Sequence, residues 1–314
     1  MIQIFNIVAP VFLILGFGYA AAALKLISEA AVDGLIRFVT YFAVTCLLFR
    51  ATATLDIANS LKLDVLASYY VPAFICFTVG ILVARKIFKQ RPGESIAAGF
   101  TTLFANSIFL GIPVAQRAYG DAANPTIFAL ISLHAATMYG LGVISMEVSA
   151  RDGAGAFAAL KKVVRSLSRN PLVIAVALGF VYNLSGIPIP AAADDALQLM
   201  AAAALPAGMF AVGATLNRYA ISESLGAASA MVALKLILHP LLAMLFALLL
   251  FDLTAIQAKT LTIMAAVPGG LNIYLFAVLY DRNKDLAASA LLLGTVFSIL
   301  SLPVWLLILE RMGP

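Results

Sequence analysis

The sequence predicts an all-helical integral membrane protein, and its composition, its long apolar stretches and its scarcity of charge carry that prediction. Of the 314 residues, 63% are hydrophobic and only 11% are charged, and the mean hydropathy is +1.04. Soluble domains have about 45–50% apolar and about 25% charged residues, so a water-soluble globule is excluded. A transmembrane helix needs about 20 mostly apolar residues, and no loop between the apolar stretches is long enough for a soluble domain.

Breaks at proline, glycine and charged clusters divide the chain into ten expected transmembrane helices. The first five lie near residues 3–25, 34–54, 64–84, 95–117 and 126–148, and the second five near 171–188, 196–217, 227–250, 259–280 and 286–309. The first span has no basic segment before it and no polar break after it. We therefore expect it to be retained as a span rather than removed as a signal peptide.

The basic residues predict the orientation in the membrane. Lys and Arg cluster in the loops 85–94 and 151–169, and cytoplasmic loops of membrane proteins collect such residues. We expect both loops in the cytoplasm and both termini outside it, in the cell (inner) membrane. The net charge of +5 has the same explanation, so it does not indicate nucleic-acid binding.

The two halves of the chain resemble each other. Residues 16–19 read Gly-Phe-Gly-Tyr, and residues 179–182 read Gly-Phe-Val-Tyr at the corresponding place in the sixth span. Because each half holds five spans, an odd number, the second copy must lie inverted in the membrane. We expect residues 1–150 and 165–314 to form two inverted five-helix repeats within one membrane domain. Inverted repeats are typical of secondary transporters.

Two expected spans are interrupted near mid-depth. Residues 104–113 read Phe-Ala-Asn-Ser-Ile-Phe-Leu-Gly-Ile-Pro, and residues 267–274 read Val-Pro-Gly-Gly-Leu-Asn-Ile-Tyr. Irregular backbone at this depth is stable only against protein or a water-filled cavity. Interrupted spans at corresponding places in two halves point to the binding site of a transporter. The alternative is a pair of ordinary proline kinks, but kinks do not require Asn106 and Asn272 beside them.

The chemistry of the breaks favours an anion. Neither break contains Asp or Glu, the residues that a tight cation site would use. We expect one half-helix to begin at Pro113 and another after Pro268, with their free N–H groups directed at the midplane. Asn106, Ser107 and Asn272 add neutral hydrogen-bonding groups. The sequence therefore predicts a small organic anion with a carboxylate as the ligand, and no metal or cofactor.

Three titratable residues lie inside spans. Lys235 and His239 are four residues apart on one face of the eighth span. An ammonium at this depth is a functional hypothesis by default, so Lys235 balances an anionic substrate, exchanges a proton, or makes a purely structural contact. His239 precedes Pro240 and could satisfy the carbonyl that the proline frees. His134 is a core histidine or a proton relay. All three are candidates for proton coupling.

The motifs of the interrupted spans resemble those of a known family. The pattern Asn-Ser-x-Phe-x-Gly-x-Pro at 106–113 resembles the signature of the auxin efflux carrier family, and the segments 235–240 and 268–272 look like further marks of it. The resemblance implies ten helices, crossing helices four and nine, and an architecture shared with bile-acid sodium symporters and sodium–proton antiporters. It also implies a scaffold of spans 1, 2, 6 and 7 with a homodimer face, and a transport domain of spans 3–5 and 8–10 that moves like an elevator.

The resemblance extends to the substrate and its site. Plant members export auxin, and bacterial members are associated with malonate, malate and similar acids; the short loops here resemble the bacterial type. Members often carry a proline near Val44, which this sequence lacks, whereas its counterpart Pro206 is present. The expected substrate-binding residues lie in spans 2, 4, 7, 8 and 9: Thr45, Phe49, Asn106, Ser107, Phe109, Gly111, Pro113, Gly208, Met209, Lys235, Pro268, Gly269, Gly270, Asn272 and Tyr274.

The leading hypothesis is thus a carrier of organic carboxylates, working as a uniporter or with protons. The alternative is a sodium-coupled organic-anion symporter, which the lack of acidic residues in both breaks disfavours. An intramembrane enzyme would need a nucleophile with its base, or a metal cluster, at depth. His134 and His239 have no carboxylate beside them in the sequence, so we do not expect an enzyme.

Overall fold

The computed structural model describes residues 2–149, 161, 163–165, 167–220 and 225–312, and these form helices and loops with no β-strand among them. The all-helical prediction is confirmed for this part of the chain. The basic segment 151–169 lies largely outside the described residues. The α-helices of the first half are α1 (Ile2–Ala23), α2 (Glu29–Phe38), α3 (Val44–Ala53), α4 (Ile57–Ser60), α5 (Leu63–Lys86), α6 (Pro92–Leu103), α7 (Ile112–Tyr119) and α8 (Asn124–Ser149).

The second half continues the same pattern. Its described α-helices are α10 (Pro171–Ser185), α11 (Ala191–Leu216), α12 (Leu225–Ala233), α13 (His239–Leu245), α14 (Ala255–Ala266), α15 (Asn272–Leu279) and α16 (Lys284–Glu310). Among the described residues, seven helical stretches are long and apolar enough to cross a membrane: 2–23, 29–53, 63–86, 107–149, 191–216, 225–250 and 284–310. The chain is therefore a multi-pass membrane protein.

Several α-helices join end to end through π-helical turns. The turn η1 (Val39–Ala43) connects α2 to α3, and η4 (Leu234–Leu238) connects α12 to α13, which η5 (Phe246–Leu250) extends. The turn η2 (Ser107–Gly111) leads into α7, and the short 3₁₀ turn η3 (Gly120–Ala123) joins α7 to α8. Proline follows η2 and η4 two residues after their ends. A π-turn is a common way to accommodate the backbone bond that a proline removes.

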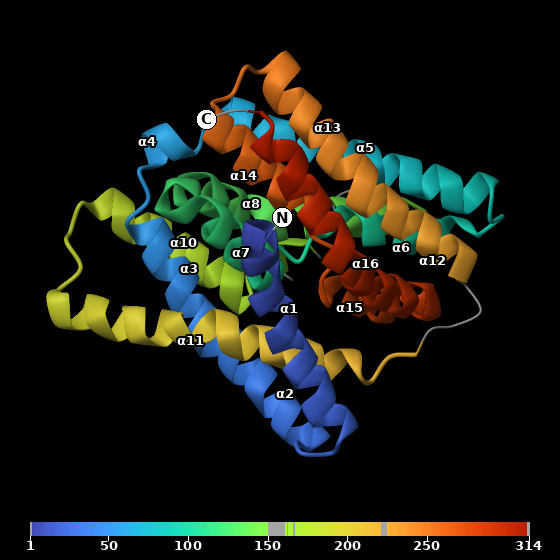
Figure 1. Cartoon of the computed structure of the whole chain (residues 1–314), viewed down its shortest axis with the longest axis horizontal. Helices are drawn as coiled ribbons and strands as arrows, with labels where there is room; N and C mark the ends of the chain where they lie inside the picture. The colour runs from blue at the N-terminus through green and yellow to red at the C-terminus, as the bar shows by residue number, and fades with distance from the viewer. Residues whose placement is uncertain (1, 150–160, 162, 166, 221–224, 313–314) are drawn as a thin grey trace.

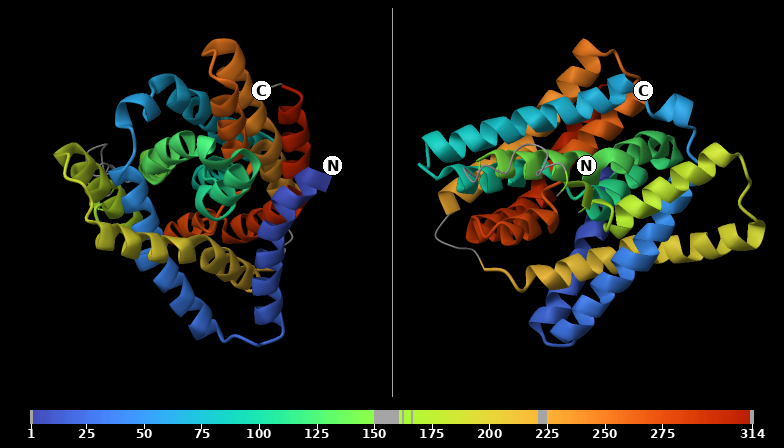
Figure 2. Two further views of the ribbon diagram at one scale, coloured as in Figure 1. Left: turned by 60° about the vertical axis from the view of Figure 1, so that its left-hand side comes forward. Right: turned by 180° about the vertical axis from the view of Figure 1, so that it is seen from behind.

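The helices pack in two groups, one at the lower left of Figure 1 and one at the upper right. In the first, α11 packs along α1 and across α3, and α10 packs against α3. In the second, α5 packs on α6 and α13, α14 packs on α13 and α16, and α12 packs on α16. Helix α7 lies near the centre of the molecule and contacts α1 and α14 (Figure 2). The two groups meet around the interrupted helices.

Glycine allows the closest contacts within the first group. A methyl group at Gly18 of α1 would overlap the backbone carbonyl of Phe210 in α11. A methyl group at Gly179 of α10 would overlap Thr52 and approach the carbonyl of Phe49 in α3. Small residues let membrane helices approach backbone to backbone, and such contacts replace the hydrophobic effect as the source of helix association in lipid. These glycines therefore set the distance between α1 and α11 and between α10 and α3.

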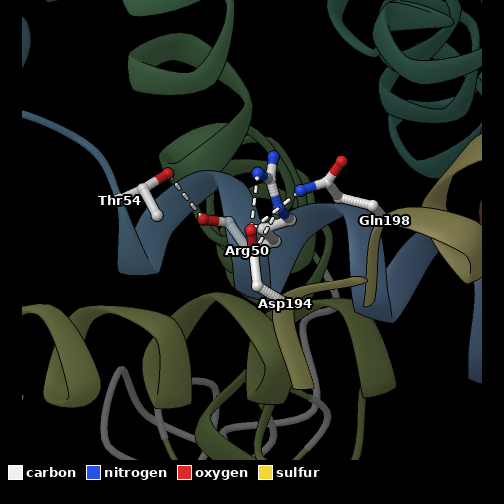
Figure 3. A network of polar contacts seen from close by, with 4 residues as sticks. All are labelled: Arg50, Thr54, Asp194 and Gln198. Atoms are coloured by element: carbon white, nitrogen blue, oxygen red, sulfur yellow. Dashed lines mark hydrogen bonds and ion pairs between the residues drawn. The ribbon is translucent and has the colours of Figure 1, made fainter. Parts of the chain in front are cut away.

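Two ion pairs tie α11 to the helix formed by α2, η1 and α3. At one end Arg50 contacts Asp194 through both nitrogens of its guanidinium edge, at 2.6 Å and 3.1 Å, and Gln198 donates to the same carboxylate at 2.8 Å (Figure 3). At the other end Arg218 contacts Asp33 at 2.7 Å. Bidentate arginine–carboxylate pairs fix orientation as well as distance. The two helices are thus fastened at both ends.

A tryptophan satisfies the carbonyl that Pro240 frees. Because proline has no N–H, the carbonyl of Leu236, four residues earlier, loses its helical partner. The indole nitrogen of Trp305 in α16 donates to this carbonyl at 2.8 Å. The expectation that His239 would do so is wrong, because the His239 ring points to Lys235 and to the carbonyl of Tyr69 instead. Trp305 therefore links α16 to the proline bend of the neighbouring helix.

We expect Trp305→Phe to lower the free energy of unfolding by about 1–3 kcal/mol, because it leaves the buried Leu236 carbonyl without a partner. Adding Pro240→Ala to that variant restores an N–H at position 240, which can bond to Leu236 within the helix. The second change should then recover more stability in the Trp305→Phe background than it gives in the wild type. Denaturant unfolding of the four proteins in detergent measures this difference, and equal effects of Pro240→Ala in both backgrounds would contradict it.

Candidate functional site: a cavity at the crossing of two interrupted helices

The two interrupted helices cross and bond to each other. Helix α6 ends at Leu103 and α14 ends at Ala266, and the extended backbone that follows each end runs antiparallel to the other. Ala105 pairs with Gly269 in an isolated β-bridge, and the N–H of Asn106 donates to the carbonyl of Pro268 at 2.8 Å. Each break therefore satisfies part of the unpaired backbone of the other, which explains how both persist in a buried position.

Helical structure resumes after each break, and one of the two expected starting points is wrong. The helix after the first break begins with η2 at Ser107, six residues before Pro113, which lies inside the continuous stretch 107–119. The helix after the second break begins at Asn272, after Pro268 as expected. The first N–H groups of a helix have no partner within it. The free donors of the first break are thus those at Ser107 and the next residues, beside Asn106.

A cavity of about 360 Å³ lies beside the crossing. Its wall comes from both groups of helices: the first turns after the two breaks, α8, α10, α11 and the start of the second span. The residues that line it are Ile36, Val39, Thr40, Leu48, Phe104, Ala105, Asn106, Ser107, Ile108, Phe109, Ile131, Ser132, His134, Ala135, Tyr139, Asn170, Pro171, Leu172, Val173, Val176, Gly208, Ala211, Val212, Thr215, Gly270, Leu271, Asn272 and Leu275. This volume suits a small organic molecule.

The polar groups of the wall gather at the crossing. Ser107 and His134 are 3% and 5% exposed, and neither the Ser107 hydroxyl nor a ring nitrogen of His134 makes a hydrogen bond of good geometry with the described residues, although Tyr69 lies close to Ser107 and the Ala105 backbone close to His134. Asn272 accepts a hydrogen bond from the Tyr139 hydroxyl at 3.1 Å, which leaves its NH₂ as a donor. Buried polar atoms are almost always hydrogen-bonded, so unpartnered ones beside a cavity indicate a site for a polar ligand.

Charge is absent from the lining as far as the structure describes it. None of the cavity-lining residues is Asp, Glu, Lys or Arg. Within the described ranges, no group of three or more His, Cys, Asp and Glu side chains is arranged to hold a metal ion. The rest of the wall is mostly aliphatic or aromatic, with polar side chains away from the crossing at Thr40, Asn170 and Thr215. The cavity thus combines one neutral polar end with an apolar body.

The structure brings some of the expected site residues to this cavity and places others outside its wall. Those that line it are Asn106, Ser107, Phe109, His134, Gly208, Gly270 and Asn272. Those that do not are Thr45, Phe49, Gly111, Pro113, Met209, Lys235, His239, Pro268, Gly269 and Tyr274. Gly208 has a definite role, because any larger side chain there would overlap the Phe109 ring. Its hydrogen-sized side chain lets η2 pack directly on α11.

The expected residues outside the wall have other contacts. Thr45 donates to the carbonyls of its own helix, and the Phe49 ring meets Tyr182 edge-on with ring centres 5.8 Å apart. The Tyr274 ring packs on Tyr219 at 4.5 Å. Lys235 and His239 are fully buried outside the cavity wall, where Lys235 lies next to Pro268 and Gly269 and the His239 ring packs against Tyr69.

Sequence reasoning missed the lining residues of α8 other than His134, those of α10 and all of those from the second span. In α8 the lining residues Ile131, Ala135 and Tyr139 follow one another at intervals of four, which is one helical face. In α11 Gly208, Ala211 and Thr215 follow one another at intervals of three and four, which is again one helical face. Once His134 or Gly208 is assigned to the wall, the residues three and four positions away, on the same face of its helix, are expected to line the cavity too. No comparable signal marks α10, whose Asn170 caps its own first turn.

Comparisons with known proteins place the chain in a family. Residues 3–306 match the family model described as "Membrane transport protein". The chain belongs to this family, that of the auxin efflux carriers. The family resemblance expected from residues 106–113 is therefore confirmed, and the chain is a membrane transporter whose relatives are named as transporters rather than enzymes.

Relatives of this auxin efflux carrier family member cover nearly its whole length. It is 21% identical to the "Putative malonate transporter" of Rhizobium meliloti, over 100% of this chain and 98% of that protein. It is 24% identical to an "Uncharacterized transporter" of Methanothermobacter thermautotrophicus, over 96% and 97%. It is 23% identical to the "Probable auxin efflux carrier component 5a" of Oryza sativa, over 98% of each chain. Bacterial, archaeal and plant transporters thus share this chain's full span.

Proposed function

We propose that this protein carries organic carboxylates and that the cavity at the crossing is its substrate site. The observation that carries the proposal is the set of donors that meet there: the free N–H groups at the start of η2, the Ser107 hydroxyl and the amides of Asn106 and Asn272. Such groups bind anions, because a helix N-terminus combines free donors with the positive end of its dipole. The carboxylate would lie between Ser107 and Asn272.

The apolar body of the cavity narrows the substrate class. A small dicarboxylate such as malonate carries charge at both ends, and one end would face the aliphatic residues Val173, Val176 and Val212. Desolvating a carboxylate without partners is costly. An acid with one carboxylate and an apolar body buries that body against the same residues. We therefore favour a monocarboxylate like auxin over the malonate named for the rhizobial relative.

Contacts in the first helix group support the inverted repeat. The contacts pair Gly18 rather than Gly16 with Gly179, which shifts the sequence match of residues 16–19 by two positions and gives Gly18–Gly179 the same offset as Phe49–Phe210. Gly18 lies against the Phe210 carbonyl, and Gly179 lies against the Phe49 carbonyl, so one contact occurs twice with its partners exchanged. That exchange is what two inverted five-helix repeats would produce. Our proposal includes ten membrane-spanning helices, residues 1–150 and 165–314 as the repeats, and crossing fourth and ninth helices.

The same arrangement suggests the motion. The scaffold would consist of α1, α10, α11 and the α2–α3 helix, and two ion pairs fasten α11 to α2–α3. The crossing and the remaining helices would move past this scaffold, as in an elevator. The cavity is lined by Asn170 and Thr215, at the helix ends nearest the basic segment that we expect in the cytoplasm. The structure would then be an inward-facing state, with both termini outside the cell membrane.

Ligand-dependent thermal stabilisation of the purified protein tests this proposal. The panel is indole-3-acetate, phenylacetate, malonate and malate, each with sodium chloride or choline chloride. We expect indole-3-acetate and phenylacetate to stabilise most, with or without sodium, because a ligand at about 100 times its Kd adds roughly 2.7 kcal/mol to the free energy of unfolding. Stabilisation that requires sodium would favour the sodium-coupled symporter instead. No stabilisation by any of the four acids would overturn the proposal.

A further inference from the structure

Lys235 lies at the crossing but on the opposite side from the cavity. Its side chain is 2% exposed, and the small space beside it, about 10 Å³, is bounded by Thr101, Pro268 and Gly269. Gly270, the next residue, lines the main cavity. One turn of irregular backbone thus separates the ammonium from the carboxylate site proposed above.

The contacts of Lys235 use its amino group as a hydrogen-bond donor. Its Nζ donates to the carbonyl of Ala265 at 3.2 Å and lies 2.8 Å from Nδ1 of His239. The other ring nitrogen of His239 lies 3.4 Å from the carbonyl of Tyr69, which can only accept. With Lys235 as the donor, His239 is neutral, with its proton on Nε2 and an acceptor at Nδ1. None of the ion pairs found in the described residues involves Lys235.

The carbonyl that accepts the hydrogen bond from Lys235 lies at the C-terminal end of α14. Ala265 is the second-to-last residue of α14, so its carbonyl is one of the last four of the helix and has no partner within it. Four helix ends meet at the crossing: the C-terminal ends of α6 and α14, and the N-terminal ends of η2 and α15. Two positive and two negative ends largely cancel. The two C-terminal ends therefore weaken the preference for an anion that the start of η2 provides.

We propose that Lys235 is a tethered cation that caps α14 and makes the crossing net positive, so that it strengthens the preference of the site for an anion. This inference rests on the proposed function. Lys235 acts through the backbone and does not touch the substrate, so it is a positioning residue. Two opposite unit charges roughly 10 Å apart at an effective dielectric constant of about 20 attract enough to change affinity on the order of tenfold.

Charge selectivity tests the role of Lys235 with a matched pair of probes. Indole-3-acetate and indole-3-acetamide have the same shape and differ in charge. Thermal stabilisation gives the affinity of each for wild type, Lys235→Met and Lys235→Arg. We expect Lys235→Met to weaken the acetate on the order of tenfold and the acetamide little, and Lys235→Arg to retain the wild-type ratio. Equal weakening of both probes by Lys235→Met means a purely structural lysine and overturns the proposal.

A second measurement needs no substrate. Lys235→Ala removes three methylenes and the ammonium, and n-propylammonium supplies the same atoms. We expect this ion to stabilise Lys235→Ala saturably and to leave the wild type unchanged. Butanol, which is neutral, should stabilise neither protein. If n-propylammonium does not distinguish the two proteins, the tethered-cation site is wrong. If it does, while no acid binds the wild type, the cation site stands and the proposed carboxylate function fails.

Discussion

Asn106→Ala should weaken carboxylate binding by about 10- to 100-fold while leaving the protein folded. A hydrogen bond to a charged group contributes about 1.5–3 kcal/mol, and the Asn106 amide is one of few polar side chains beside the proposed carboxylate position. The bond that holds the crossing together uses the backbone N–H of Asn106, which alanine keeps. Titration of thermal stabilisation by indole-3-acetate measures the change.

The control for this variant is Asn59→Ala. Asn59 is exposed on the short helix α4 and bonds to Asp56, away from the cavity. The same chemical change there should leave binding at the wild-type level. An Asn106→Ala protein with unaltered affinity would remove the crossing from the substrate site.

Gly18→Leu should lower the free energy of unfolding by about 3 kcal/mol or more, because the side chain must displace the Phe210 backbone and separate α1 from α11. Gly16→Leu is the matched control. Gly16 lies two residues earlier in the same helix and has open space around its α-carbon. Leucine also favours the helix over glycine by roughly 0.8 kcal/mol, so Gly16→Leu should be neutral or stabilising.

Denaturant unfolding of both variants in detergent checks this pair. If Gly18→Leu and Gly16→Leu have similar stability, the close approach of α1 and α11 does not hold the first helix group together. If Gly18→Leu alone is destabilised, the result supports the glycine–carbonyl contact, which Gly179 also makes, as a feature shared by the two halves. Because Gly16 and Gly18 differ only in what they face, helix propensity cannot account for a difference of opposite sign.

Composition and periodicity are sufficient for the helical membrane character and for the two interruptions. The apolar stretches locate the helices because lipid demands about 20 such residues per crossing. Pro268 and the asparagines mark the breaks because each either lacks a backbone donor or competes with the backbone for hydrogen bonds. These signals are local in the chain, which is why they are readable without a structure.

The finer geometry depends on contacts between distant segments. The start of the half-helix at Ser107 depends on the pairing of Ala105 with Gly269, which no local pattern encodes. The partner of the Leu236 carbonyl comes from Trp305, far along the chain. The depth of Lys235 in its span predicts a functional role, but only the structure places its amino group at the end of α14 rather than in the cavity.

Uptake into proteoliposomes tests the central claim, that the crossing is the substrate site of a carboxylate carrier. Radiolabelled indole-3-acetate and malonate are offered in sodium-free buffer to vesicles containing wild type, Asn106→Ala or no protein. We predict saturable uptake of indole-3-acetate by wild type above the empty vesicles, and a large reduction by Asn106→Ala. Uptake that appears only with sodium, or that is the same in wild type and Asn106→Ala, would contradict the account.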